Sequence, residues 1–387
     1  MTTLSSEEIN RYSRHLILPE VGPKGQEALK ASSVLCIGAG GLGCPLLLYL
    51  AAAGVGRIGI VDFDVVDDSN LQRQVLYGVS NVGQSKAQVA KQKLLDLNPH
   101  ITVEVHEVRL TSDNALDLFK DYDVIADGTD NFATRYLVND ACVLTGKPNV
   151  YGSIFRFEGM VSVFNYQNGP NYRCLYSEPP PPGLVPSCAE GGVLGVLPGV
   201  VATLQANEVI KVLLGMGDVA SGRLIRFNAL KLEFKELKVT KRDDYEINEL
   251  IDYEQFCGIP QQEDKMVPEI SVHKLKEKID ANEEFALIDV RVESEYEICN
   301  INGKLIPLNT LDEHFDQLDK SAEYVVHCKM GGRSARAVEQ MQDFGFTNVV
   351  NLAGGILEWI DEIDDSTHMI IFEKPFEISE KIAHFIK

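Results

Sequence analysis

Apolar and polar stretches alternate in a regular order along the first third of the chain. Residues 32–40 (SSVLCIGAG) form an apolar run that ends in glycines, and residues 44–54 (CPLLLYLAAAG) are typical of a buried helix with proline in its first turn. A second apolar run follows at residues 57–64 (RIGIVDFD). The other elements predicted here are a helix and two strands, at residues 84–97, 102–108 and 122–130. Such an order predicts an α/β fold, a doubly wound, Rossmann-like sheet with helices on both faces.

The pattern changes near residue 151. Residues 151–164 and 222–239 are long β-rich runs, which we expect to extend the sheet and make it mixed. Residues 175–199 are rich in proline and glycine and predict a loop, because four successive prolines fit neither a helix nor a central strand. Residues 202–215 (ATLQANEVIKVLLG) then predict a helix with a glycine stop.

A second cycle of short elements begins after a polar stretch. The segments FALIDVR, EYVVHC, RSARAVEQMQDFGF and NVVNL alternate strands with a helix and predict a smaller α/β domain. We therefore divide the chain into a domain at residues 1–260, a linker at 261–268, a domain at 269–365 and an unassigned tail at 366–387.

Composition narrows the classes of partner and compartment. The formal net charge is −21 over 387 residues, which argues against nucleic acid or an anionic membrane as the main partner. No uninterrupted apolar stretch approaches the roughly 18 residues that span a bilayer, and the N-terminus lacks the pattern of a signal peptide. The eight cysteines are scattered without a Cys-x-x-Cys pair. We expect a cytoplasmic protein with one or two reactive thiols and no disulfide framework.

The glycines after the first predicted strand form a candidate phosphate site. Gly38, Gly40 and Gly43 give the spacing G-x-G-x-x-G between a strand and a helix, with Gly41 as an additional glycine. Backbone N–H groups at such a helix start favour anions, and Asp62 ends the next strand where a ribose-binding acid is expected. These features fit a dinucleotide enzyme equally well.

Two cations and a further acid favour the cleavage of a nucleoside triphosphate. Arg73 and Lys86 follow in a polar loop and at the start of a helix, where they can offset charge on transferred and leaving phosphates. Asp130 ends another strand at the same sheet edge and is a natural Mg²⁺ ligand beside a polyphosphate. Taken singly, each cation could be a solvated surface group and Asp130 could cap the next helix.

Six motifs in order resemble the ubiquitin-activating-enzyme-like adenylyltransferases of the MoeB/ThiF family: RYSRH, IGAGGLGCP, DFDVVDDSNLQRQ, GQSKA, DGTDNFATR and VPSCAEGGVLGVLPG. The resemblance implies that ATP binds and that the C-terminal glycine of a ubiquitin-fold sulfur carrier ending in Gly-Gly is adenylated. It also implies a homodimer, because Arg14 matches an arginine that reaches the neighbouring subunit's site. The predicted nucleotide-binding set is Gly38, Gly40, Gly41, Gly43, Asp62, Asp64, Asn70, Arg73, Lys86, Asp130 and Asn131.

Cysteine positions both extend and limit the resemblance. Cys188 stands at the family's cysteine position in the Pro/Gly loop, which implies a thioester or persulfide partner; an inert loop cysteine is the alternative. Members of the family commonly hold zinc with two Cys-x-x-Cys pairs, but here only Cys174 and Cys257 are present and the first position of each pair is Asn171 or Glu254. We expect no structural zinc, with polar or apolar packing in its place.

The second domain carries a candidate sulfur site. Cys328 begins CKMGGRS between a strand and a helix, where loop N–H groups and the helix terminus favour a thiolate and Arg333 adds positive charge. A buried structural cysteine is the alternative. With LIDVR and NLAGGILEWI, this stretch resembles a single rhodanese domain, which implies that Cys328 carries a persulfide. Asp289 and Arg291 match its DVR motif, interpreted as structural.

Together the two resemblances imply an adenylyltransferase fused to a sulfurtransferase. ATP with Mg²⁺ activates the carrier, and sulfur from a separate persulfide donor passes through Cys328 to give a thiocarboxylate. Carriers of molybdopterin, thiamine, tRNA-thiolation and siderophore or amino-acid pathways all fit. The alternatives are an NAD-dependent oxidoreductase with an attached thiol domain and a non-catalytic scaffold for a ubiquitin-like partner.

Overall fold

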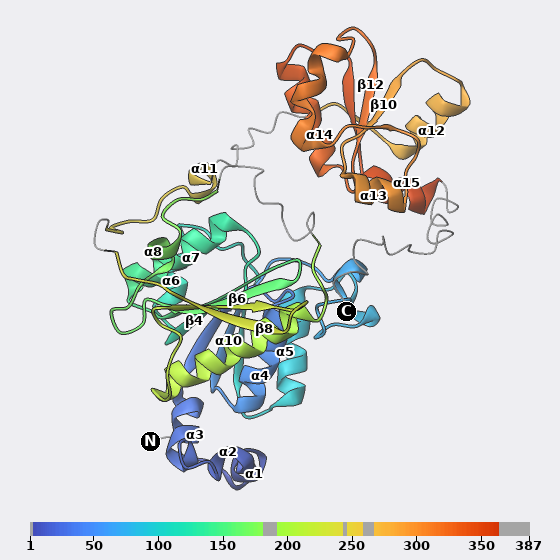
Figure 1. Cartoon of the computed structure of the whole chain (residues 1–387). Coiled ribbons are helices and arrows are strands. Elements are labelled where there is room, and N and C mark those ends of the chain that lie inside the picture. Colours follow the sequence, from blue (N-terminus) through green and yellow to red (C-terminus); the bar gives the residue numbers. More distant parts are fainter. Residues whose placement is uncertain (1–2, 181–191, 243–245, 258–266, 364–387) are drawn as a thin grey trace, which may run out of the picture. The chain divides into compact units, whose positions relative to one another are not determined.

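The computed structural model describes residues 3–180, 192–242, 246–257 and 267–363 (Figure 1). The chain divides after Gln261 into two compact units. Cys188, most of the predicted linker and the predicted tail at 366–387 lie outside the described residues. Each unit is an α/β structure around its own sheet, which confirms the predicted fold class.

Unit 1 contains an eight-stranded mixed sheet in the order β3-β2-β1-β4-β5-β6-β7-β8. The first five strands of this order are parallel, and β5 to β8 are antiparallel. Their bounds are β1 Ser33–Ile37, β2 Arg57–Val61, β3 Thr102–His106, β4 Val124–Asp127, β5 Asn149–Phe155, β6 Glu158–Phe164, β7 Arg223–Asn228 and β8 Glu233–Lys238.

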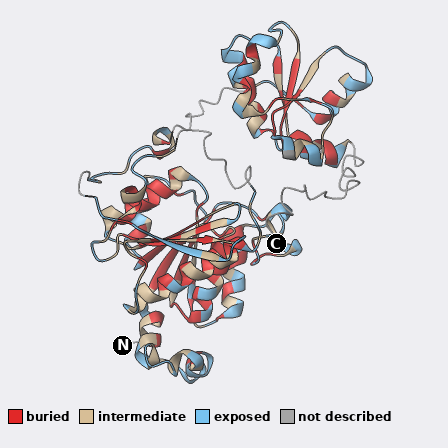
Figure 2. Ribbon diagram, viewed as in Figure 1, coloured by how far each residue is buried: buried red, intermediate tan, exposed pale blue. Residues whose placement is uncertain are grey.

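Helices cover both faces of this sheet (Figures 1 and 2). On β1, Val34 and Cys36 belong to one buried cluster together with residues of α4, α5 and α10, while Leu35 and Ile37 belong to another with residues of α6 and α7. This alternation follows from the two-residue period of a strand. The helices are α1 Ser6–Arg11, α2 Ser13–Leu16, α3 Gly22–Ala31, α4 Gly43–Ala53, α5 Lys86–Leu97, α6 Ala115–Phe119, α7 Phe132–Thr145, α8 Tyr172–Leu175, α10 Leu197–Leu214 and α11 Tyr253–Phe256, with short 3₁₀ turns at Asp68–Asn70 and Val79–Asn81.

Both β-rich runs predicted near the end of unit 1 fold back as hairpins. The first turns between β5 and β6 at Arg156, and the second turns between β7 and β8 near Leu232. Both residues have left-handed backbones, with φ of 53° and 49°. The sequence offers no glycine at either turn position, so the β-rich pattern alone did not locate the turns.

The glycine turn between β1 and α4 depends on close backbone approach. Gly38 has φ of 92°, a conformation that favours glycine. A Cβ atom on Gly43, the first residue of α4, would lie 2.1 Å from the Gly38 carbonyl oxygen. The helix can therefore start this close to the end of β1 only with glycine at position 43.

Helix α10 is the one helix among the described residues that is long and apolar enough to cross a membrane. It packs against α4, β5 and β6 inside unit 1. Its buried Gln205 donates from Nε2 to the Asp127 carbonyl at 2.8 Å, and its Glu208 accepts the Ala220 N–H at 2.8 Å. This packing makes α10 a helix of the core of unit 1, which accounts for its apolar composition. It begins at Leu197, five residues earlier than predicted, with Pro198 in its first turn.

Unit 2 contains a five-stranded parallel sheet in the order β11-β10-β12-β13-β9. Its strands are β9 Glu269–Ile270, β10 Ala286–Asp289, β11 Lys304–Leu305, β12 Tyr324–His327 and β13 Val349–Leu352. Its helices are α12 Val272–Asp280, α13 Glu293–Ile298, α14 Gly332–Asp343 and α15 Gly355–Glu362, with 3₁₀ turns at Leu308–Thr310 and Asp312–Gln317. The only tryptophan of the chain, Trp359 on α15, is buried in this unit.

A histidine lies in the core of unit 2 beside a buried carboxylate. His327 ends β12 and is fully buried, with its Nε2 atom 3.6 Å from an Asp289 oxygen. Burial lowers the pKa of His327 to about 4, with Arg291 acting in the same direction and Asp289 in the opposite one. At neutral pH the contact therefore joins a carboxylate to a neutral imidazole, and it is not an ion pair.

We predict that Gly43→Ala destabilises unit 1 by about 3 kcal/mol, because the added methyl group would overlap the Gly38 carbonyl. Gly199→Ala is the control, since a Cβ there meets nothing within 4 Å, and it should leave stability unchanged or slightly raised. Chemical denaturation followed by far-UV circular dichroism measures both. Equal stability of Gly43→Ala and the parent would contradict the close approach.

Unit 2 should lose stability as the pH falls from about 6.5 to 4. The unfolded chain takes up a proton on His327 in this window and the folded chain does not, so the free energy of unfolding decreases by up to about 3 kcal/mol. Trp359 fluorescence during urea unfolding reports this unit alone. His327→Gln should flatten the pH dependence, whereas replacement of the exposed His273 by Gln should preserve it.

Candidate active site

A cavity of about 260 Å³ opens at the carboxyl ends of β1, β2 and β4. Ligands of open α/β sheets bind at this edge, because the loops that leave adjacent parallel strands meet there. Nine of the eleven residues predicted to bind nucleotide line it: Gly38, Gly40, Gly41, Asp62, Asp64, Arg73, Lys86, Asp130 and Asn131. The structure therefore brings together residues that are up to 93 positions apart in the sequence.

Asp62 connects the end of β2 to the glycine turn. Its Oδ2 atom accepts the Ala39 N–H at 2.7 Å, and its Oδ1 atom accepts the Asp64 N–H at 2.9 Å. Burial raises the pKa of Asp62, while these two N–H groups act in the opposite direction. The carboxylate thus fixes the shape of the turn at the cavity wall.

Lys86 reaches the cavity from the first position of α5. Its side chain is only 8% exposed, and Nζ lies 3.0 Å from an Asp64 oxygen. Ser85 caps the helix through its hydroxyl, which places Lys86 at the helix start. The Tyr77 hydroxyl donates to the Ala39 carbonyl at 2.7 Å, which ties this loop to the glycine turn. A nearly buried ammonium group held in this way is positioned for an anionic ligand.

Arg73 lines the same cavity and follows the short 3₁₀ turn at Asp68–Asn70. Its guanidinium donates to the Ser69 carbonyl at 3.2 Å, and its Cδ atom lies 3.7 Å from the position of a Cβ on Gly41. Asn70 does not line the cavity. Its carbonyl accepts the N–H groups of Arg73 and Gln74 at 3.0 and 2.9 Å, so in this structure Asn70 shapes the turn that carries Arg73.

Asp130 faces the cavity and does not cap α7. The N-cap of this helix is Asn131, whose Oδ1 atom accepts the Thr134 N–H at 2.9 Å. The alternative of Asp130 as a helix cap is therefore wrong. The Asp130 side chain is exposed at the cavity, where it can meet a cation or a ligand.

Sequence reasoning missed Arg135, which also lines the cavity. Its guanidinium donates to the Thr129 carbonyl at 3.1 Å and lies 5.6 Å from the Phe132 ring centroid and 5.9 Å from that of Tyr151. It therefore supports the loop that carries Asp130. Arg135 follows Asn131 by four residues, so the two side chains lie on one face of the helix. This spacing could have suggested that Arg135 belongs to the site.

Two predicted residues lie away from the cavity wall, and one is not described. Arg14 is exposed on the short helix α2, and Gly43 packs beneath the glycine turn. Neither lines the cavity. Cys188 lies outside the described residues.

The second candidate site surrounds Cys328, directly after β12 in unit 2. Its Sγ atom accepts the Gly331 N–H at 3.2 Å and the Ser334 hydroxyl at 3.3 Å. The loop continues into α14, and Gly331 has φ of 95° at the helix N-cap. The Cys328 carbonyl accepts the Ile356 N–H at 2.9 Å, which fixes the loop against α15. The sulfur thus lies in a cradle of hydrogen-bond donors at a helix N-terminus.

Arg333 directs its guanidinium to Glu295 of α13. Both of its terminal nitrogens lie 2.7 Å from Glu295 oxygens, so its charge is compensated. Burial works to raise the pKa of Glu295, but the hydrogen bonds and charge of Arg333 outweigh it and the pKa is lowered. The expected effect of the Arg333 charge on the sulfur stays a prediction; the donors described at Sγ are Gly331 and Ser334.

Asp289 and Arg291 form a buried pair, as expected of structural residues. The Arg291 guanidinium lies 2.6 Å from Asp289, and it also donates to the Cys299 carbonyl at 2.7 Å. The pair therefore ties β10 to the end of α13.

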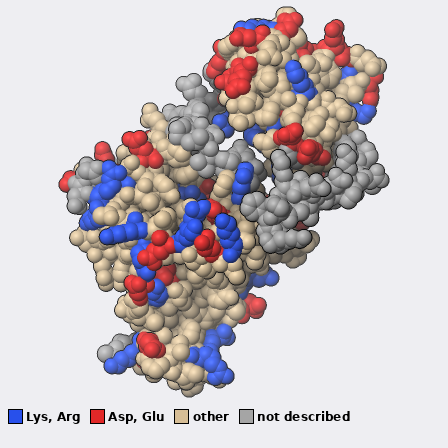
Figure 3. All heavy atoms as spheres, in the orientation of Figure 1, with Lys and Arg blue, Asp and Glu red and all other residues tan. Residues whose placement is uncertain are grey.

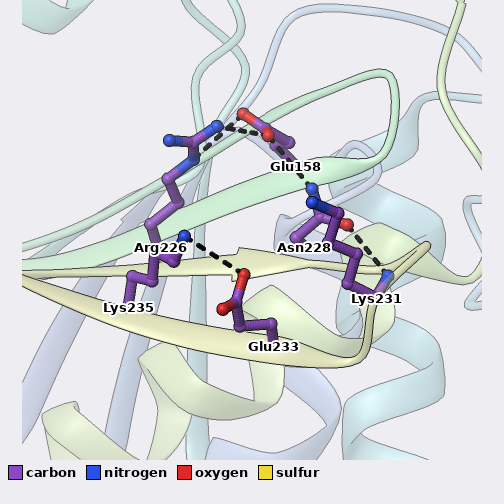
Figure 4. Close-up of a pocket in the computed structure, with 6 residues that line it drawn as sticks. All are labelled: Glu158, Arg226, Asn228, Lys231, Glu233 and Lys235. Atoms are coloured by element: carbon purple, nitrogen blue, oxygen red, sulfur yellow. Dashed lines mark hydrogen bonds and ion pairs between the residues drawn. The ribbon is translucent and has the colours of Figure 1, made fainter.

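A smaller hollow of about 130 Å³ lies on the β6–β8 strands (Figure 4). Four of its five charged side chains are paired: Arg226 donates to Glu158 at 3.1 Å, and Lys235 lies 3.4 Å from Glu233. Basic and acidic side chains are also interspersed on the visible face of unit 1 (Figure 3). We therefore assign the chemistry to the larger cavity.

Comparisons with known proteins agree with this geometry. The ThiF family model matches residues 12–247, and the rhodanese-like domain model matches residues 271–362. A Mycobacterium tuberculosis protein named probable adenylyltransferase/sulfurtransferase MoeZ is 51% identical over 374 residues, which cover 94% of this chain and 95% of that protein. A Thermus thermophilus protein named sulfur carrier protein adenylyltransferase is 54% identical over 267 residues, covering 66% of this chain and 98% of its own.

Among solved structures, Escherichia coli MccB crystallised with ATP superposes with a TM-score of 0.54 at 24% identity, covering 63% of this chain and 75% of that one. This likeness shows the fold of unit 1. The Mycobacterium tuberculosis relative matches nearly the whole chain, and the ThiF model alone covers more than half of it. The chain therefore belongs to the ThiF family, whose fold it shares, and it is an adenylyltransferase joined to a rhodanese-type sulfurtransferase.

Proposed function

We propose that the chain adenylates the C-terminal glycine carboxylate of a ubiquitin-fold sulfur carrier and then converts it to a thiocarboxylate with sulfur held on Cys328. The observation that carries the proposal is the cavity of unit 1, where Arg73, Lys86 and Asp130 converge on the start of α4. The Thermus thermophilus relative, named for a sulfur carrier, supports the class of substrate.

The residues of the cavity suit attack by a carboxylate on the α-phosphorus of ATP. A carboxylate is ionised at neutral pH and needs no side-chain base, so catalysis reduces to alignment and compensation of charge. Backbone N–H groups of the glycine turn and the N-terminus of α4 would hold phosphate oxygens. Arg73 and Lys86 would offset the charge that develops on the leaving pyrophosphate.

Asp130 would hold Mg²⁺ in this site. The described residues contain no group of three or more acids, cysteines or histidines placed to bind a metal by themselves. This donor set fits Mg²⁺ bound to a nucleotide, because that ion commonly uses one or two carboxylates together with substrate phosphates and water. When bound, Mg²⁺ would neutralise phosphate charge.

The sulfur step follows from an acyl-adenylate and a persulfide. The terminal sulfur of a Cys328 persulfide attacks the acyl carbon and AMP leaves, which gives an acyl disulfide on Cys328. The Cys188 thiolate then attacks the Cys328 sulfur, which releases the carrier thiocarboxylate and leaves a Cys188–Cys328 disulfide. An external thiol reduces this disulfide, and a separate donor reloads the persulfide.

The same proposal includes a homodimer and a reducing compartment. Arg14 is exposed and does not line the cavity of its own chain, so it is available to a neighbouring subunit. Thiolate and persulfide chemistry needs free thiols, which the cytoplasm maintains. Carriers of the molybdopterin, thiamine and tRNA-thiolation pathways remain candidates for the substrate.

Two substitutions should separate the activities. We expect Cys328→Ala to leave ATP–pyrophosphate exchange unchanged and to reduce carrier thiocarboxylate by about a thousandfold, because it removes the sulfur nucleophile. Asp130→Ala should reduce exchange by about a hundredfold or more and leave sulfur transfer from thiosulfate to cyanide intact. Exchange assays and mass spectrometry of the carrier measure these results.

Cys299→Ala is the matched thiol control, since this half-buried cysteine lies in the same unit, and it should retain both activities. Loss of exchange and sulfur transfer together in Cys328→Ala would contradict the division of labour. Failure to form AMP with any Gly-Gly carrier would contradict the adenylation itself.

A further inference from the structure

The residues at the family's zinc positions are engaged in other contacts. The Asn171 side chain caps α8 by accepting the Arg173 N–H at 2.9 Å. Glu254 is paired with Arg109. The Cys174 sulfur accepts the N–H groups of Asn171 and Arg242, both at 3.4 Å. A closed zinc site takes four thiolate or imidazole ligands, so two thiols beside an amide and a paired carboxylate do not fit it.

A buried carboxylate instead connects the two segments that zinc would hold. Asp140 on α7 is 2% exposed. It accepts two hydrogen bonds from Arg173 of α8, at 2.8 Å from Nε and 2.7 Å from a terminal nitrogen. Its Oδ2 atom also accepts the Tyr253 hydroxyl of α11 at 2.7 Å. One carboxylate therefore joins α7 to helices α8 and α11, which lie some 80 residues apart in sequence.

Aromatic rings complete the surroundings of the Arg173 guanidinium. Its central carbon lies 4.7 Å from the Phe256 ring centroid and 5.0 Å from that of Tyr136. Tyr136 meets Phe256 edge to face, with centroids 5.2 Å apart and planes at 83°. The guanidinium is thus held by a bidentate ion pair and by ring faces from α7 and α11, which is a geometry that lysine cannot reproduce.

Asn139 adds a second connection from α7 to α8. Its Nδ2 atom donates to Asp140 at 2.9 Å, and its Oδ1 atom accepts the Tyr172 N–H at 2.7 Å. The buried charges are therefore balanced, and the Asp140 oxygens are well supplied with donors. Under these conditions a buried ion pair is costly to break from one side.

We propose that this cluster of Asp140, Arg173, Tyr253, Tyr136 and Phe256, the Asp140 anchor, fastens α8 and α11 to unit 1 without a metal. It performs the structural task that two Cys-x-x-Cys pairs and zinc perform in other members of the family. Cys174 and Cys257 act as packing residues. The inference concerns the stability of unit 1 and does not depend on the identity of the carrier.

Metal content tests whether α8 and α11 are held to unit 1 without zinc. The full-length protein, purified from zinc-supplemented culture, should contain less than about 0.1 zinc per chain by plasma mass spectrometry. Incubation with EDTA or phenanthroline should leave the Tm of unit 1 unchanged, and Cys174→Ser with Cys257→Ser should not alter this result. Stoichiometric zinc whose removal lowers the Tm would overturn the inference.

Substitutions within the Asp140 anchor test whether this cluster holds α8 and α11 to unit 1. Asp140→Asn and Arg173→Met should each lower the Tm of unit 1 by about 10 °C, because each leaves a buried partner unpaired. The double variant should lose clearly less than the sum, since no unpaired charge remains. Tyr253→Phe keeps the ring, removes one hydrogen bond and should lower the Tm by about 5 °C even if the other variants fail to fold.

Matched controls separate the anchor from a general effect of charge removal. Lys120→Gln breaks the exposed pair with Asp117 and should leave the Tm unchanged. The transition of unit 2, followed by Trp359 fluorescence, should not move in any of these variants. Full stability of both Tyr253→Phe and Arg173→Met would show that the segments are held by something else.

Discussion

The adenylating unit depends on how closely α4 approaches the end of β1. The Gly38 carbonyl lies where a side chain on residue 43 would have to be, so the helix starts directly beneath the turn. This closeness places Gly40, Gly41 and Leu42, the residues just before the helix, at the cavity wall, while the Cys44 N–H of the first turn donates to the Gly40 carbonyl at 2.9 Å. Asp62 and Tyr77 then hold the Ala39 backbone from two sides, which keeps the turn in shape.

Unit 2 also has a loop that leads from a parallel strand into the N-terminus of a helix. Cys328 follows a parallel strand and precedes the N-terminus of α14, as the glycine turn of unit 1 precedes α4. In the proposed function the group held here is the Cys328 sulfur, and the donors of Gly331 and Ser334 lie close around that one side chain. In unit 1 the proposed anion is a nucleotide, and the residues proposed to hold it line a cavity. The strand-to-helix junction thus serves both chemistries.

Local sequence patterns made much of the fold and of the candidate site in unit 1 predictable. Strand and helix order follow from the short-range hydrophobic period. The position of Asp130 follows from parallel strands that end at one edge, and that of Lys86 follows from the start of a helix. The contacts that sequence reasoning missed join residues distant in the chain. Glu295 meets Arg333 across 38 positions, and Tyr253 meets Asp140 across 113. No local period records such pairs, because tertiary packing selects them.

The two hairpin turns, at Arg156 and near Leu232, show a different limit of prediction from sequence. Arg156 and Leu232 adopt left-handed backbones that their residue types disfavour, so strand pairing within the sheet overrides local preference there. Sequence rules based on glycine or asparagine turns therefore gave no turn position within the two β-rich runs, each of which forms two strands. The expected extension of the sheet is unaffected, since β5 to β8 follow β4 in the strand order.

The charge of the chain bears on where phosphate can bind, and the covalent linkage of the two units explains why the two activities share one chain. A protein with net charge −21 repels free nucleotide in general, so the cations of the cavity create a local exception where phosphate is favoured. An acyl-adenylate formed there is prone to hydrolysis. A sulfur donor on the same chain meets it at an effective concentration set by the length of the connecting segment and not by diffusion of a second protein. Fusion therefore favours the proposed sulfur transfer over loss to water.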